Sequence, residues 1–246
     1  MTKRRNPMKK LCTLMMALVC SLTLAACSQG QGTEKRQASL AFFDALHKTL
    51  MAQSMEIEGT ADISTNMSLS GRFHLYLNQK QDLELALEVD GSAMGIPVND
   101  VFNFYIRDGK TYLNSMGTKS QSLAENIGLK PGEKLESWDP FLSMTDEQKE
   151  KCFKSVSVSH DQYRFEIDPV SLAYYLDSLG STTVDRADME ATINDGTLTA
   201  LKLDLEGVYR IQDQSQPFTA VVDMEAEDIN KDVAVPYPAD PANWGK

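Results

Sequence analysis

Alternation of apolar and polar residues is the clearest pattern in the chain. Leu83, Leu85, Leu87 and Val89 alternate with charged or small residues. Successive side chains of a strand point to opposite faces, so this spacing predicts a strand with one buried face. The same period of two predicts a weaker strand over about 56–69 and clearer strands over 72–78, 82–89, 102–106, 110–116, 154–159, 162–167, 184–194, 197–209 and 217–228.

Short polar segments separate these strands. Residues 78–82, the pair Asp108-Gly109 and the triplet Asn194-Asp-Gly196 are typical of tight hairpin turns. Short connections make consecutive strands pair as antiparallel neighbours. An open sheet of around nine strands with one apolar face must curl, so we expect a half-barrel.

Two segments have a helical period instead. Leu40, Phe43, Leu46 and Leu50 recur at intervals of three and four residues and predict a helix over 35–54. Asp168-Pro169 is a helix start that predicts a second helix over 169–179.

A helical insertion is expected over about 118–152. It comprises a short helix from Ser120 to Asn126 and a helix that begins at the capping box Thr145–Gln148. The fold class predicted is therefore α+β, a curved antiparallel β-sheet (half-barrel) with helices packed on its concave face, in one domain over 35–246. The tail from Val233 to the C-terminus, with three prolines, is expected to be extended.

The N-terminus has a basic start, an apolar run over 11–26 and the sequence Leu-Ala-Ala-Cys27. This run is shorter than the roughly 20 residues of a membrane span.

The segment resembles the lipobox of bacterial lipoproteins. That resemblance implies that residues 1–26 are a signal peptide cut between Ala26 and Cys27, and that a diacylglycerol on Cys27 anchors the protein to the outer side of a cell membrane. The polar residues 27–34 are expected to be a flexible tether. The alternative is an uncleaved N-terminal anchor helix.

Net charge and cysteine content limit the classes of binding partner and the covalent cross-links that we expect. Five of the 24 Lys and Arg residues, and none of the 35 Asp and Glu residues, precede Cys27, so the net charge without residues 1–26 is −16. A chain this acidic is not expected to bind nucleic acid, which needs basic patches. Only Cys152 remains besides Cys27, so we expect no intramolecular disulfide and a packed, unreactive thiol.

No motif for catalysis, phosphate binding or metal binding is found in the sequence. His47, His74 and His160 are far apart and lack cysteine partners, so no metal site is expected. Acidic pairs such as Asp204 and Glu206 lie two residues apart on one strand face and are expected to be solvated. We therefore predict a protein that is not an enzyme and needs no cofactor.

The order of the elements resembles the LolA and LppX/LprG type of lipoprotein. The features shared are the lipobox, the helix over 35–54, strands from about Glu56 and the hairpin at Asn194–Gly196. The resemblance implies a cavity between sheet and helices that takes acyl chains. The apolar residues expected to line it are Met67, Phe73, Leu75, Leu85, Leu87, Phe102, Phe104 and Met224.

Two functions remain open at this point. In the first, a membrane-anchored lipoprotein binds an acyl chain or another apolar ligand in that cavity. In the second, the same apolar residues fill an ordinary core, and the protein is an interaction or sensory module that binds a protein or a cell-wall polymer on its surface.

Overall fold

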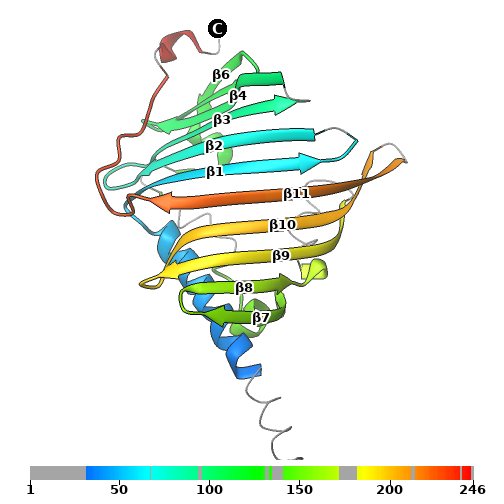
Figure 1. Ribbon diagram of the computed structural model, residues 1–246. Coiled ribbons are helices and arrows are strands. Elements are labelled where there is room, and N and C mark those ends of the chain that lie inside the picture. The colour runs from blue at the N-terminus through cyan, green and yellow to red at the C-terminus, as the bar shows by residue number, and fades with distance from the viewer. Residues whose placement is uncertain are drawn as a thin grey trace, which may run out of the picture.

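The computed structural model describes residues 32–66, 68–93, 96–130, 133–134, 141–171, 182–211, 214–238 and 240–244. These residues form one antiparallel sheet with a helix across one of its faces (Figure 1). Its strands are β1 (Ser54–Ser64), β2 (Ser68–Asn78), β3 (Glu84–Ala93), β4 (Ile96–Arg107), β5 (Lys110–Ser115), β6 (Thr118–Leu123), β7 (Phe153–Ser159), β8 (Gln162–Ile167), β9 (Thr182–Asn194), β10 (Thr197–Ile211) and β11 (Gln214–Glu227).

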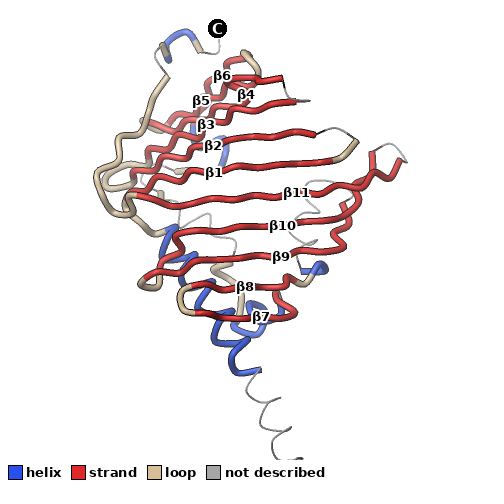
Figure 2. The backbone as a smooth tube through the Cα atoms, in the orientation of Figure 1, coloured by secondary structure: helices blue, strands red, loops and turns tan. Residues whose placement is uncertain are grey.

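The sheet consists of two meanders joined in the middle. Its order is β6-β5-β4-β3-β2-β1-β11-β10-β9-β8-β7, so the first and last strands pair with each other. β6 and β7 form the two ends of this order, and the sheet does not close (Figure 2). Register shifts after Val89, Leu198 and Glu206 mark bulges, which bend a strand and increase its twist. The predicted α+β fold, an open antiparallel half-barrel with helices on its inner face, is confirmed.

The N-terminal helix is described over residues 32–50 and lies across β7–β10 (Figure 1). It ends four residues before the predicted position because Ser54 already pairs with Asn78 of β2. It also includes residues 32–34, which the sequence analysis assigned to the tether. A second helix, α2 (Asp146–Lys151), begins at the expected capping box, where Gln148 N–H donates to Thr145 Oγ1 over 3.3 Å and Thr145 N–H donates to Gln148 Oε1 over 2.8 Å.

Two predictions of secondary structure are wrong. The expected helix over 120–126 is a strand, β6, followed by one 3₁₀ turn, η1 (Ala124–Ile127). The turn at Met116-Gly117, where both residues have positive φ, returns the chain along β5, and pairing overrides the local pattern. The strand expected over 56–69 ends at Ser64, and β2 begins at Ser68 and not at residue 72, so the boundary between the first two strands was misplaced.

Of the helix predicted over 169–179, residues 169–171 are helical and the remainder lies outside the described residues. Asp168 caps it, since its carboxylate accepts from the Ser171 N–H over 3.3 Å. The hairpin turns predicted at 78–82, Asp108-Gly109 and Asn194–Gly196 are confirmed. None of the described helices is long and apolar enough to span a bilayer.

The described side chains form three apolar clusters. The first joins the N-terminal helix to β7–β10, and the second lies on the same inner face over β1–β4 and is covered by η1 and Leu129. The third is on the outer face, where Trp244 packs against Tyr105 and Tyr112. The prediction that the sheet is covered on one face only is therefore wrong over β3–β5, because the extended C-terminal segment crosses their outer face.

Candidate functional site: the apolar inner face of the sheet

The register of β2, β3 and β4 places most of the predicted cavity residues together. Leu75, Leu87 and Phe104 lie side by side across the three strands. Phe73 and Phe102 belong to the adjacent row, with Val89 between them, and Leu85 belongs to the row on the other side. Met224 of β11 is opposite Gly59, and Gly59 is opposite Phe73. Met224 therefore extends the row of Phe73 and Phe102 into β11. Met67 lies outside the described residues.

Burial decreases along these strands from one end to the other. At the end near η1, Leu77, Leu85 and Ile106 are buried, with 0, 5 and 3% of their surface exposed. The next two rows, which contain Phe104 and Phe102, are only partly buried.

At the hairpin tips of β1–β2 and β3–β4 the apolar side chains are exposed. Ile63, Leu69 and Ile96 are exposed by 40, 42 and 64%. They share one row and one face, since Ile63 is opposite Leu69, and Ala93 is opposite both Leu69 and Ile96. Among the described residues, the cover of this apolar inner face of β1–β4 ends part of the way along the strands.

A row of small, partly buried residues crosses this surface between Phe73 and the hairpin tips. Ala61, Gly71 and Gly91 are direct neighbours on β1, β2 and β3. A Cβ atom at Gly71 would come no closer than 3.6 Å to any atom outside its own neighbours, so this position has room for a side chain. We call Ala61, Gly71 and Gly91 the small-residue row.

Gly59, in contrast, is covered. A Cβ atom there would lie 2.2 Å from Phe73 Cζ and 2.7 Å from the carbonyl oxygen of Asp223. The ring of Phe73 therefore lies directly over Gly59. This contact holds the ring down against the sheet, so that it forms part of the apolar floor.

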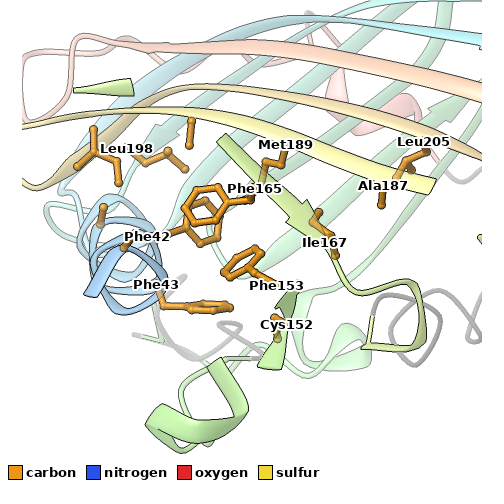
Figure 3. Close-up of a cluster of buried hydrophobic side chains, with 14 of the residues drawn as sticks. Phe42, Phe43, Cys152, Phe153, Phe165, Ile167, Ala187, Met189, Leu198 and Leu205 are labelled. Carbon is orange, nitrogen blue, oxygen red and sulfur yellow. The ribbon is translucent and has the colours of Figure 1, made fainter. Parts of the chain in front are cut away.

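The other half of the inner face is filled. Phe42 and Phe43 of the N-terminal helix point into the sheet and meet Phe153 and Phe165 (Figure 3). The ring centroid of Phe42 lies 5.7 Å from the ring centroid of Phe153 and 5.3 Å from that of Phe165. The space expected between this helix and the sheet is occupied by side chains over β7–β10.

Among the described side chains of these strands, the charged groups lie on the outer face. Arg164, Glu190, Lys202 and Asp223 follow one another across β8–β11 on the outer face, and Arg164 pairs with Glu190 over 3.2 Å. His74 is also on the outer face, 2.6 Å from Glu58. Beside it, burial and then the charges of Glu56, Glu88 and Glu58 raise the pKa of Tyr76 above its ordinary value.

Among the described residues no group of three or more His, Cys, Asp or Glu side chains is placed to hold a metal ion. Cys152 is buried, as predicted, and its thiol donates to the Gln148 carbonyl over 3.4 Å. Burial, followed by the charge of Asp168, raises the pKa of this thiol, which disfavours the reactive thiolate. The chemistry that the inner face offers is burial of apolar groups.

The sequence analysis missed the exposed end of this face. Ile63, Leu69, Ile96 and Val98 were not among the cavity candidates, although they continue the same rows. The alternation around Leu69 was visible, but its direction depends on the bend at Thr65-Asn66, which was assigned to a continuous strand. The Gly59–Phe73 contact joins neighbouring strands and has no local pattern.

No family model matches this sequence, and no curated protein matches it. Among solved structures, the chain is similar to LprF from Mycobacterium bovis, with 16% identity and a TM-score of 0.41 over 85% of this chain and 99% of LprF. It is also similar to an AttH candidate from Nitrosomonas europaea, with 11% identity and a TM-score of 0.25 over 77% of this chain and 53% of the other.

Proposed function

We propose that this protein is an extracytoplasmic lipoprotein, anchored through a lipid on Cys27, that binds an acyl chain on the inner face of β1–β4 and β11. The observation that carries the proposal is that the described residues cover that face only in part. Its apolar rows run from the buried Ile106 past the partly buried Phe102 to the exposed Ile96. Soluble proteins rarely leave such a continuous apolar surface without a ligand or partner for it.

The magnitudes favour an aliphatic ligand. Burial of each CH₂ group contributes about 0.8 kcal/mol, so a chain of ten or more carbons gains several kcal/mol even after its ordering entropy is subtracted. No charged side chain belongs to the described rows, which leaves nothing there to recognise a polar ligand. The headgroup of such a lipid would lie beyond the hairpin tips, in water.

The proposed anchor would keep the domain near a source of lipid. Only residues 28–31 separate Cys27 from the first described residue of the helix. At about 3.3 Å per residue they reach at most about 13 Å. Residues 32–34 belong to the helix and add no flexible length, so the domain would remain close to the bilayer.

Native mass spectrometry tests the proposal. The protein starting at Ser28, expressed in bacteria, is expected to carry copurified lipid. Gly71→Leu places a side chain in the small-residue row at a position with room for its Cβ atom, so it should reduce the lipid-bound fraction at least fivefold. Ser70→Leu adds the same side chain on the outer face of the same strand and serves as the matched control.

Lipid binding that is equal in the two variants would show that the small-residue row is not the site. A repeated absence of lipid from the parent protein would instead favour a surface-binding module.

A further inference from the structure

A separate cavity lies at the opposite end of β4, where the Asp108-Gly109 turn meets the segment after β6. It has a volume of about 320 Å³. This is within the range of small-molecule sites. Its lining residues are Asp82, Leu83, Ile106, Asp108, Gly109, Leu123, Ala124, Glu125, Leu129, Lys130 and Glu133.

The floor of this cavity is apolar and well ordered by its contacts. Leu83, Ile106, Ala124 and Leu129 are each at most 8% exposed. The Ala124 N–H donates to the Gly109 carbonyl over 2.9 Å, which ties η1 to the β4–β5 hairpin. The floor is therefore formed before any ligand arrives.

The rim of the cavity is strongly acidic. Asp82, Asp108, Glu125 and Glu133 face a single cation, Lys130. Glu133 already accepts the backbone N–H of Lys130 over 2.9 Å. Within the described part of the chain, neither Asp82 nor Asp108 forms an ion pair.

Asp82 and Asp108 also line a second hollow of about 330 Å³, which is polar and includes Lys80 and Glu84. Both of these charges are neutralised elsewhere: Lys80 pairs with Asp232 over 2.6 Å, and Glu84 pairs with Arg107 over 3.2 Å. The carboxylates of Asp82 and Asp108, which form no ion pair within the described residues, thus lie at the boundary between the apolar cavity and this polar hollow.

We propose that this cavity binds a small amphiphilic amine, with its apolar body on Leu83, Ile106 and Leu129 and its ammonium group against Asp82 and Asp108. The apolar floor gains from burial of a hydrocarbon or aromatic group. The net negative rim favours a cation and repels a carboxylate of the same shape. This site opens at the end of β4 opposite the hairpin tips, and it meets the proposed acyl-binding rows at Ile106.

The test uses the mature lipoprotein in phosphatidylcholine nanodiscs, with empty nanodiscs as the blank. Benzylammonium is titrated by calorimetry, and benzyl alcohol and benzoate are the neutral and anionic probes of the same shape. Benzylammonium is expected to bind with a Kd in the millimolar range or below, at least tenfold more tightly than either control probe.

The double variant D82N/D108N should weaken benzylammonium binding at least tenfold. Asn tolerates the positive φ of 52° at position 108, so the turn is kept. D161N/D195N removes the same charge elsewhere, including an equivalent Asp-Gly turn where Asp195 has a φ of 51°, and should bind like the parent protein. Unchanged binding in D82N/D108N, equal binding of benzyl alcohol, or no binding of benzylammonium would each overturn the proposal.

Discussion

The two halves of the inner face differ in what covers them. Over β7–β10, the N-terminal helix brings Phe42 and Phe43 against two sheet phenylalanines, and side chains fill the interface. Over β1–β4, the described cover is one 3₁₀ turn and Leu129, and it ends before the hairpin tips. Strand alternation is similar in both halves. An apolar strand face therefore identifies an inner surface, but it does not reveal whether protein or ligand covers that surface.

The largest effect should come from the helix-covered half. Phe42→Ala removes a ring that is 6% exposed and contacts three other phenylalanines, so we expect the free energy of unfolding to fall by about 3–5 kcal/mol. Phe102→Ala, in the β1–β4 half, should cost about 1 kcal/mol because its ring is partly exposed in the absence of ligand. Urea denaturation measures both values. Equal losses would mean that the two halves are packed alike.

An intermediate effect is expected at Gly59. Gly59→Ala places a methyl group against Phe73 and the Asp223 carbonyl, and should cost about 1–3 kcal/mol of unfolding free energy. Phe73→Ala in the same chain should recover part of that loss, because the ring is the closer obstacle. The matched control is Gly71→Ala, which has room for the methyl group and should be neutral or slightly stabilising. A loss at Gly71 as large as that at Gly59 would contradict the difference between covered and uncovered positions.

The smallest effect concerns the outer face of β3–β5, which the C-terminal segment covers. Burial, followed by a hydrogen bond with Tyr112, raises the pKa of Tyr237 to about 12, whereas a free tyrosine has a value near 10.0. The neutral phenol is therefore favoured in the folded state. Its contribution to stability is complete below pH 10 and is lost as the pH rises from 10 through 12.

We expect the fluorescence of Trp244 to report release of this segment over that pH range. The Trp138→Phe background leaves Trp244 as the only tryptophan. Tyr237→Phe should reduce the pH dependence between 10 and 12, and an unchanged profile in that variant would assign the transition to another group.

Much of the fold could be predicted from the sequence because it depends on local signals. The alternation around Leu85, the turn at Asp108-Gly109 and the capping box at Thr145 each act within a few residues, and each was located correctly. Strand β6 was missed because its sequence, TKSQSL, has no apolar alternation, and its conformation comes from pairing with β5.

The candidate site was predictable only in part. Alternation identified Phe73, Leu75 and Phe104 as residues of one face, and the register brings them together. The extent of cover over that face depends on where distant segments pack, such as Leu129 on Ile106 or Trp244 on Tyr105. The carboxylates of Asp82 and Asp108 at the proposed amine site were also missed, because only the pairing of β3 and β4 brings these two residues to the same cavity.

Photo-crosslinking with a diazirine-labelled fatty acid, followed by peptide mapping, tests whether an acyl chain binds on the uncovered half of the inner face. The label should be found on the inner face of the β1–β4 half, in peptides containing Ile63, Leu69, Phe73 or Phe102, and competing unlabelled fatty acid should remove it. Labelling spread over the outer face, or confined to the helix and β7–β10, would contradict an acyl site on the uncovered half.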